Sequence, residues 1–460
     1  MTKNLTAGSP VKLIILFTLP LLIGNLFQQL YAVADTLVVG RMLGVDALAA
    51  VGASGSLQFL LFGFAMGAST GMGIPVARAF GSGDLRATRR AVAAGAIISA
   101  TIATAITLIG IFGSGALLTL LGTPAELMDD AQTFLGVLFA GAVATVAFNF
   151  LSSMIRALGD SRTPLVFLII ASVLNVGLVV LFIAVFKLGV GGAALATVVA
   201  QGISVVLCLA LIGMRIPELR LRRADWRVGR LELGEASRLG LTMGFQMSVI
   251  AIGAALLQVG INHLGTDAVA AFTAALRVDQ VAVIPLASVG VAISTYVAQN
   301  RGAAEWWRIR HGVQRATLMA IGLSLAMSVA IVAFGTDLVQ LFVGPGEHRV
   351  IAMAHEYLII NGSLYWVLAA LFVWRGALQG MGATWVPTLA GVMELIARGV
   401  VGLVLVDQLG FLGVTLAAPL AWVGALIPLT IAWFLQRRRL LVAERALAGA
   451  EASELVPVTR

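Results

Sequence analysis

Long apolar runs recur from one end of this 460-residue chain to the other, and they constrain its fold more than any other feature. The hydrocarbon core of a bilayer is about 30 Å thick, so a helix that crosses it needs about 20 mainly apolar residues. Backbone groups in lipid must pair internally, and continuous runs predict helices rather than the alternating strands of a barrel. Charged residues, 11% of the chain, are too few for a water-soluble protein of this size.

We therefore expect an all-α integral membrane protein with twelve transmembrane helices. They are predicted near residues 13–39, 51–77, 92–112, 131–155, 164–186, 190–214, 239–261, 271–299, 313–334, 354–374, 386–406 and 411–435. The first run is longer than the core of a signal peptide, so we expect it to remain as a helix. The single cysteine, Cys208, lies inside an apolar run and is expected to pack there.

The net charge of +8 is explained by membrane orientation rather than by nucleic-acid binding. With the N-terminus in the cytoplasm, most Lys and Arg residues fall on the inner side, as the positive-inside rule requires. We expect both termini to be cytoplasmic. The densest basic stretch, from Arg215 to Arg238, is interpreted as an orientation signal that contacts lipid headgroups.

An internal repeat indicates how the helices are organised. The sequence LGVDALAA at residues 43–50 matches LGTDAVAA at residues 264–271, and each copy lies near the start of its half of the chain. Each half would hold six helices, an even number, so we expect two parallel six-helix bundles related by a pseudo-twofold axis along the membrane normal. The predicted domains are an N-terminal bundle (1–214), a basic cytoplasmic linker (215–237), a C-terminal bundle (238–436) and a cytoplasmic tail (437–460).

Asp35 is the one carboxylate well inside a predicted span of the first half. A central Asp costs about 2.5 to 3.5 kcal/mol on insertion scales, so its side chain should face the bundle interior or a hydrated cavity. We assign proton coupling to Asp35, with Tyr31, Asn149 and Asn175 as its polar neighbours. The alternative is that these three side chains hold Asp35 by hydrogen bonds only to fix helix packing. Pro20, in the same helix, is a candidate hinge because it removes a backbone donor.

In the second half, two positive and two negative residues could neutralise one another, and we place the substrate cleft or a polar cluster at these residues together with Gln246. They are Arg277, Asp279, Glu394 and Arg398. Glu394 and Arg398 are four residues apart, a favourable spacing for an ion pair on one helix. Arg277 and Asp279 point in different directions and need partners on other helices. Structural pairing and a role in coupling or ligand binding remain equally open for this cluster.

Several classes of function are disfavoured by what the sequence lacks. The four histidines are scattered without carboxylate or cysteine companions at metal-ligand spacing, which argues against a metal site. There is no P-loop for nucleotide hydrolysis and no nucleophile with a base, so we expect neither an enzyme nor a cofactor. Energy for transport would then come from an ion gradient.

Five segments, in this order, give the chain a resemblance to a known family. They are QLYAVADTLVVG (29–40), RALGDSRTP (156–164), RVDQ (277–280), VAQN (297–300) and LQGMG (378–382). Together they resemble the multidrug and toxic compound extrusion (MATE) family, in particular its DinF-like branch. The resemblance implies export of amphipathic, often cationic organic compounds, and it makes Asp35 similar to the first-helix aspartate that couples cation movement to export.

Two departures from the family pattern bear on the coupling ion. Val179 stands where several relatives have an aspartate of a sodium site. The second departure is a shortage of acidic residues, since the tenth predicted helix has only one, Glu356, near its outer end. Too few oxygen donors then remain for a sodium cage, although Thr197 could supply one. We therefore expect exchange of drugs for protons by a monomer whose partners are small organic substrates and membrane lipids. The alternatives are a sodium-coupled drug antiporter and a flippase for lipid-linked precursors.

Overall fold

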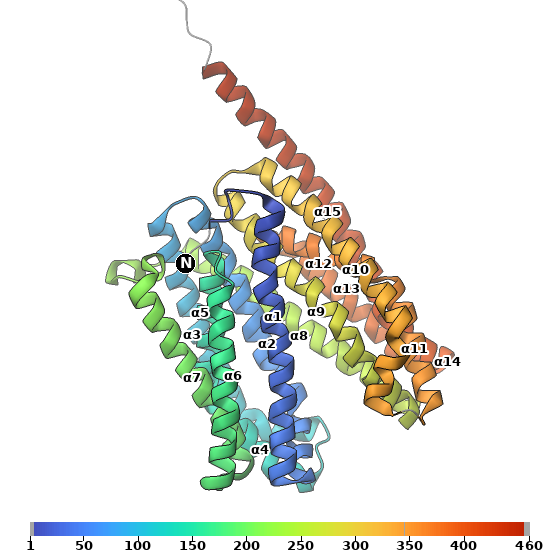
Figure 1. The fold of residues 1–460 in the computed structure, drawn as a ribbon. Coiled ribbons are helices and arrows are strands. Elements are labelled where there is room, and N and C mark those ends of the chain that lie inside the picture. The colour runs from blue at the N-terminus through green and yellow to red at the C-terminus, as the bar shows by residue number, and fades with distance from the viewer. Residues whose placement is uncertain (1–3, 345, 455–460) are drawn as a thin grey trace, which may run out of the picture. The chain divides into compact units, whose positions relative to one another are not determined.

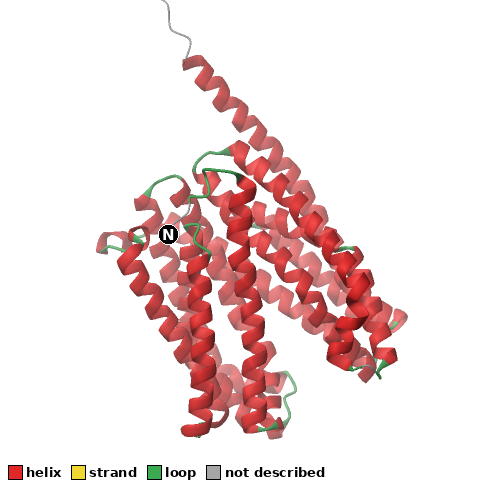
Figure 2. Ribbon diagram, in the orientation of Figure 1, coloured by secondary structure: helices red, strands yellow, loops and turns green. Residues whose placement is uncertain are grey.

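The computed structural model describes residues 4–344 and 346–454, and in that part of the chain every regular element is a helix (Figures 1 and 2). Among these residues, nine helices are long and apolar enough to cross a bilayer, and two more spans are each broken into a pair of helices. The remaining expected span is α13 (Trp385–Val400), continued by the π-helical turn η4 (Val401–Leu405) and the short α14 (Val406–Leu409). The chain is an all-α membrane protein with twelve transmembrane helices, as its apolar runs predict.

The chain divides into two compact units, which are described separately. Unit 1 contains Leu19–Phe80 and Asp84–Ile252. Its elements are α1 (Pro10–Leu43) from Leu19 onward, α2 (Val45–Gly81), α3 (Leu85–Leu120), α4 (Ala125–Ala140), α5 (Ala142–Ala157), α6 (Arg162–Val180), η1 (Leu181–Val185), α7 (Gly189–Arg215) and α8 (Arg230–His263) as far as Ile252. Within this unit α6 lies along α7, and α3 packs against α4 and α5 (Figure 1).

Unit 2 contains Asn4–Thr18, Gly81–Gly83 and the chain from Gly253 onward. Its further elements are α9 (Thr266–Gly302), α10 (Trp306–Val343), α11 (His348–Ser363), α12 (Tyr365–Gly380), α13, η4, α14 and α15 (Phe411–Glu454). Here α9 packs against α10, α11 and α12, and α13 packs against α15. Helices α1 and α8 each begin in one unit and continue into the other.

Two of the predicted spans are bent rather than straight, which corrects the expectation for residues 131–155 and 354–374. The first is α4 and α5, which meet at Gly141 with a bend of 50°, and the second is α11 and α12, which meet at Leu364 with a bend of 51°. A Cβ on Gly141 would lie 2.2 Å from the side chain of Val198, so only glycine fits this corner. At the second break, the Ser328 hydroxyl donates to the carbonyl of Gly362 and competes with the helical ladder.

These irregularities recur at matching positions of the two halves. The break at Gly141 falls in the fourth predicted span of the first half, and the break at Leu364 falls in the fourth predicted span of the second. The π-helical turns η1 and η4 follow at Leu181 and Val401, in each half at the end of the fifth span. The same sequence of bends in both halves supports the internal repeat that the octapeptide match indicates.

The segment expected to be a linker is partly helical and is held against unit 1. Two 3-10 turns, η2 (Pro217–Leu219) and η3 (Arg223–Trp226), contact α3, and Arg89 donates to the carbonyl of Pro217 at 2.9 Å. Helix α8 begins at Arg230, so residues 230–237 are helix rather than linker. At the other end of the chain, α15 runs to Glu454, so the described part of the expected tail is helical too.

The turn between α5 and α6 explains one of the five family-like segments. Oδ1 of Asp160 accepts hydrogen bonds from the amides of Arg162 and Thr163 at 3.0 Å, and Oδ2 accepts from the Thr163 hydroxyl at 2.6 Å. Burial opposes ionisation of Asp160, but these donors outweigh it and hold the pKa of this carboxyl below its ordinary value. Asp160 therefore satisfies the free amides at the start of α6.

Glycine allows α2 and α8 to approach each other within unit 1 until their backbones touch. A Cβ on Gly67 would lie 2.4 Å from the carbonyl oxygen of Met243, and one on Gly71 would lie 2.3 Å from that of Leu239. Since lipid supplies no hydrophobic drive for helix association, such close contact is the main source of packing energy in a membrane.

Replacing Gly71 by Ala is expected to destabilise the protein by about 1 to 3 kcal/mol, because the new methyl group must push two backbones apart. Gly63→Ala is the matched control, since Gly63 lies on the same helix and nothing stands within 4 Å of its added Cβ. The unfolding free energy of both variants can be measured by SDS titration from mixed micelles. Equal stability of the two variants would contradict the backbone contact.

Candidate functional site

A polar cluster in unit 1 surrounds the segment of α1 that carries Asp35. Tyr31 lies one turn before Asp35 on the same face of the helix, and its hydroxyl is 3.3 Å from Oγ1 of Thr197 on α7. Nδ2 of Asn175 on α6 donates to the same Oγ1 at 3.1 Å, and Thr197 in turn donates to the carbonyl of Ala193 at 3.3 Å. Three helices of unit 1 therefore meet at one threonine hydroxyl.

The hydrogen bonds of this cluster leave two oxygens unused. A threonine hydroxyl donates once and accepts twice, so Thr197 is fully satisfied by Ala193, Tyr31 and Asn175. Oδ1 of Asp35 and Oδ1 of Asn175 are both buried and have no hydrogen-bond partner among the described residues. A buried acceptor without a donor is rare in proteins and calls for an explanation. An oxygen in this state is available to bind a proton or a cation.

The structure brings together most of the residues predicted for proton coupling, but not all of them. Asn149 on α5 donates to the carbonyl of Thr145 in its own helix, and no described bond joins it to Asp35. Thr197, which sequence reasoning treated only as a spare ligand, is the centre of the cluster. Val179, four residues after Asn175 on α6, is fully buried and apolar. No described residue forms an ion pair with Asp35, so the static pairing with a basic side chain is not observed.

In unit 2, the carboxyl group of Asp279 on α9 accepts a hydrogen bond, in contrast to Oδ1 of Asp35 in unit 1. The hydroxyl of Tyr365, at the start of α12, donates to Oδ1 of Asp279 at 2.6 Å. Both side chains are buried, and Arg398 on α13 lies close enough for its charge to act on Asp279. Trp422 covers Tyr365, with ring centroids 6.2 Å apart. Asp279 therefore sits in a closed environment with a hydroxyl donor of its own.

The expected ion pair between Glu394 and Arg398 is not the one that forms. Oε1 of Glu394 instead accepts from Nη2 of Arg375 on α12, and only 8% of each of these two side chains is exposed. The two residues lie on neighbouring helices, α12 and α13. Nε of Arg398 is left buried without a hydrogen-bond partner among the described residues. A spacing of four permits a pair on one helix, but packing between helices decides it.

The other predicted residues are placed apart from this cluster. Arg277 is exposed on α9, two residues from the buried Asp279, as their different directions predict. Gln246 is buried on the part of α8 that belongs to unit 1, whereas the four charged residues belong to unit 2. Pro20 lies inside α1, which is helical on both sides of it, and its role as a hinge stays a prediction. Among the described residues, no three His, Cys, Asp or Glu side chains are grouped to hold a metal ion.

Comparison with known proteins identifies the family. The model of the MatE family matches residues 20–181 and again residues 243–404. The chain belongs to the MatE family. Each of the two matches contains one of the two broken spans, at Gly141 and at Leu364, so the repeated match supports a chain built from two related halves. The chain is accordingly a multi-pass membrane transporter and not an enzyme.

Curated relatives cover most of the chain. The probable multidrug resistance protein YpnP of Bacillus subtilis is 30% identical over 83% of this chain and 84% of its own length. The probable multidrug resistance protein NorM of Thermotoga maritima is 25% identical over 86% of this chain and 85% of its own. DNA damage-inducible protein F of Escherichia coli is 25% identical over 83% of this chain and 82% of its own. These names confirm the resemblance to MATE proteins.

Solved structures agree on the fold. A MATE protein crystallised in complex with MaL6 has a TM-score of 0.86 and 22% identity, covering 97% of this chain and 100% of the other. An outward-facing multidrug resistance MATE family transporter of the MOP superfamily has a TM-score of 0.85 and 22% identity, covering 97% of this chain and 99% of the other. At this identity the likeness shows a shared fold.

Removing one partner of the buried Arg375–Glu394 pair is expected to lower the unfolding free energy much more than removing both. Glu394→Leu leaves the Arg375 charge buried and unpaired, which should lower the unfolding free energy by about 3 to 5 kcal/mol. Adding Arg375→Met to that variant should restore most of the loss. Asp267→Asn is the control, because its pair with Arg349 is exposed (45% and 81%) and should contribute at most about 1 kcal/mol. Similar losses for Glu394→Leu and the double variant would contradict the buried pairing.

Proposed function

We propose that this transporter exports amphipathic, often cationic organic compounds across the inner membrane of a bacterium in exchange for protons. The observation that carries the proposal is Oδ1 of Asp35, which is buried in a polar cluster without a donor or a cationic partner among the described residues. A carboxyl group in this position has two states with different chemistry. It is neutral and compatible with an apolar site when protonated, and it attracts a cation when it is not.

The substrate class follows from the relatives. Two of the relatives reported above, from Bacillus subtilis and Thermotoga maritima, are named probable multidrug resistance proteins, and family membership makes a similar range of small organic substrates the best-supported cargo. Export from the cytoplasm requires that the bound site open first to one side and then to the other. In this scheme, protonation of Asp35 from outside releases the drug, and deprotonation toward the cytoplasm resets the protein.

The polar neighbours of Asp35 would set its position rather than transfer the proton. Tyr31 and Asn175 are both directed to Thr197, so neither competes for Oδ1 of Asp35. Asp279 is the less suitable coupling group, because Tyr365 and Arg398 already surround it. We assign the polar cluster of unit 2, with Glu394 and its partner, to maintaining helix packing in that unit.

Sodium is the second candidate for the coupling ion. Oδ1 of Asp35, Oδ1 of Asn175 and the Thr197 hydroxyl are oxygen donors of the kind that hard cations prefer. The buried Val179 adds no ligand on that side of α6, which favours the proton. A flippase for lipid-linked precursors would need a strongly cationic cavity. The buried Arg375 is already paired with Glu394, which leaves few free cationic groups such as Arg277 and Arg398 to line one.

Further parts of the proposal concern the surroundings of the protein. We propose that both termini are cytoplasmic, that the transporter acts as a monomer, and that the basic segment with η2 and η3 contacts lipid headgroups. The exposed arginines of this segment, Arg220, Arg222, Arg223, Arg227 and Arg230, support that orientation.

Asp35→Asn is expected to abolish exchange of drug for protons, because the amide cannot take up or release a proton. Transport of a fluorescent cationic dye would be measured in proteoliposomes under an imposed pH gradient and, separately, an imposed sodium gradient. The unmodified protein should respond to the pH gradient, and the variant should lose about 100-fold or more of that rate, in line with the usual contribution of a single proton-transfer group.

The control for this experiment is Asp130→Asn, which changes an exposed carboxyl near the start of α4 and should leave exchange unchanged. Both variants must elute as a single species and melt as the unmodified protein does. Undiminished pH-driven exchange by Asp35→Asn would reject the assignment of Asp35. Transport that responds only to the sodium gradient would reject the proton as the coupling ion.

A further inference from the structure

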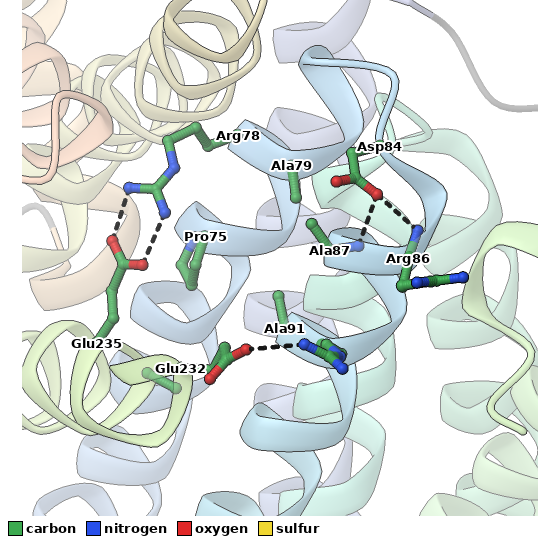
Figure 3. A pocket seen from close by; sticks show the side chains of 11 residues that line it. Pro75, Arg78, Ala79, Asp84, Arg86, Ala87, Ala91, Glu232 and Glu235 are labelled. Carbon is green, nitrogen blue, oxygen red and sulfur yellow. Dashed lines mark hydrogen bonds and ion pairs between the residues drawn. The ribbon is translucent and has the colours of Figure 1, made fainter. Parts of the chain in front are cut away.

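The start of α8 is fastened to α2 and α3 by two ion pairs within unit 1. Nη1 and Nη2 of Arg78 on α2 donate to the two carboxylate oxygens of Glu235, each at 2.7 Å (Figure 3). Nη1 of Arg90 on α3 lies 3.6 Å from Oε1 of Glu232. We call these four residues the α8 latch. Its side chains are 25% to 42% exposed, so water competes with both pairs. The single contact between Arg90 and Glu232 is the weaker one, because Arg78 and Glu235 are joined by two parallel hydrogen bonds.

A cavity of about 190 Å³ lies beside the latch. Small side chains of Ala79 and Ala91 form part of its wall (Figure 3), and so does Ala236. The carboxylates around it already have partners, because Oδ1 of Asp84 accepts from the amides of Arg86 and Ala87 at 2.9 Å and the remaining carboxylates belong to the latch. The cavity therefore offers no unused carboxylate to a ligand, and what it provides is room for water and for movement of α8.

A second set of contacts, in unit 2, is mostly buried, unlike the α8 latch. The N-terminal segment lies on the ends of α9 and α10, where the amide of Leu5 donates to Oε1 of Gln299 at 2.9 Å. Asn300 and Arg308 both donate to the carbonyl of Leu5 at 3.2 Å, and Arg308 also donates to the carbonyl of Gly8 at 2.8 Å. Leu5, Gln299 and Asn300 are at most 2% exposed. We call these contacts of Leu5 and Gly8 the N-terminal clamp. Its contacts at Leu5 are buried and involve backbone groups, so they do not open easily, whereas the bond to Gly8 is exposed.

The N-terminal clamp and the α8 latch each hold one of the two helices that pass from one unit to the other. Helix α1 begins in unit 2, at the clamp, and continues into unit 1 after Thr18, whereas α8 begins in unit 1, at the latch, and continues into unit 2 after Ile252. If the units change their relative orientation during transport, a helix that is held in both must bend or be released at one end. The α8 latch is more exposed to water than the buried contacts of the N-terminal clamp, so it is the weaker of the two.

We propose that the α8 latch opens and closes during each transport cycle, while the N-terminal clamp stays closed. This inference rests on the proposed alternating access and adds the contact that must break for it. The glycine contact between α2 and α8, where the two backbones touch at Gly67 and Gly71, forms the pivot. The ion pairs of Arg78 and Arg90 thus select one conformation and do not merely stabilise the fold.

Chemical cross-linking tests the opening directly. Cys208 is the only cysteine, so Cys208→Ala provides a background in which Arg78→Cys and Glu235→Cys can be joined by a short bis-methanethiosulfonate. The matched control joins Arg310→Cys to Glu444→Cys, because that pair is also made through two guanidinium nitrogens, at 2.7 and 3.0 Å, but its helices α10 and α15 lie wholly in unit 2. Dye exchange in proteoliposomes is measured before cross-linking, after it, and after reduction with dithiothreitol.

Cross-linking of 78 to 235 is expected to reduce exchange about tenfold or more, as blocking a required conformational step does, and reduction should restore it. Cross-linking of 310 to 444 should leave exchange unchanged. Unimpaired exchange by the cross-linked 78–235 protein would overturn the latch. If that double variant is not produced as a folded protein, Arg90→Cys with Glu232→Cys provides the same test on the second ion pair.

A second measurement does not depend on transport and so separates the latch from the proposed function. Spin labels at the exposed positions Arg86→Cys and Leu231→Cys report the separation of α3 from the start of α8. Double electron–electron resonance in lipid nanodiscs at pH 5 and pH 8 should show two distances whose populations change. A single unchanged distance would overturn the latch even if dye exchange is observed, and two distances without any exchange would support the latch and reject only the drug-for-proton function.

Discussion

A polar group inside a bilayer must find its partner within the protein, and this requirement separates the buried side chains into two kinds. The carboxyl groups of Asp279 and Glu394 meet the requirement, through a tyrosine hydroxyl and an ion pair between neighbouring helices. Asp35 does not, since one of its oxygens is buried without a donor among the described residues. Partnered groups hold helices together, whereas an unpartnered carboxyl retains a chemical state that can change. The assignment of structure to one half and coupling to the other depends on this difference.

The architecture could be predicted from the sequence because its main signals are one-dimensional. Apolar length alone located the spans, and the match between residues 43–50 and 264–271 indicated two related halves. The candidate site was predicted in part for the same reason. Asp35 and Asn175 stand out as polar residues in apolar runs, and Tyr31 lies one helical turn from Asp35. Each of these inferences needs only the composition of a single segment.

The parts that could not be predicted depend on contacts between segments. Thr197 is an ordinary residue in its own helix, and only the approach of α1, α6 and α7 makes it the acceptor for two neighbours. Spacing within α13 favoured Arg398 for Glu394, but α12 brings Arg375 closer. The breaks in two spans were not predicted because hydropathy is unaffected by a bend. The start of α8 was assigned to the linker because its acidic residues reduce the apolar signal.

The matching bends of the two halves show that one helical shape can form by different local means. A bend of 50° at Gly141 and one of 51° at Leu364 occupy equivalent places in the two halves. The first corner requires glycine, because an added Cβ would collide with Val198, whereas the second forms at a leucine beside the Gly362 carbonyl that the Ser328 hydroxyl engages. A substitution that straightens one broken span therefore has no direct effect on the other, and each half can be altered separately.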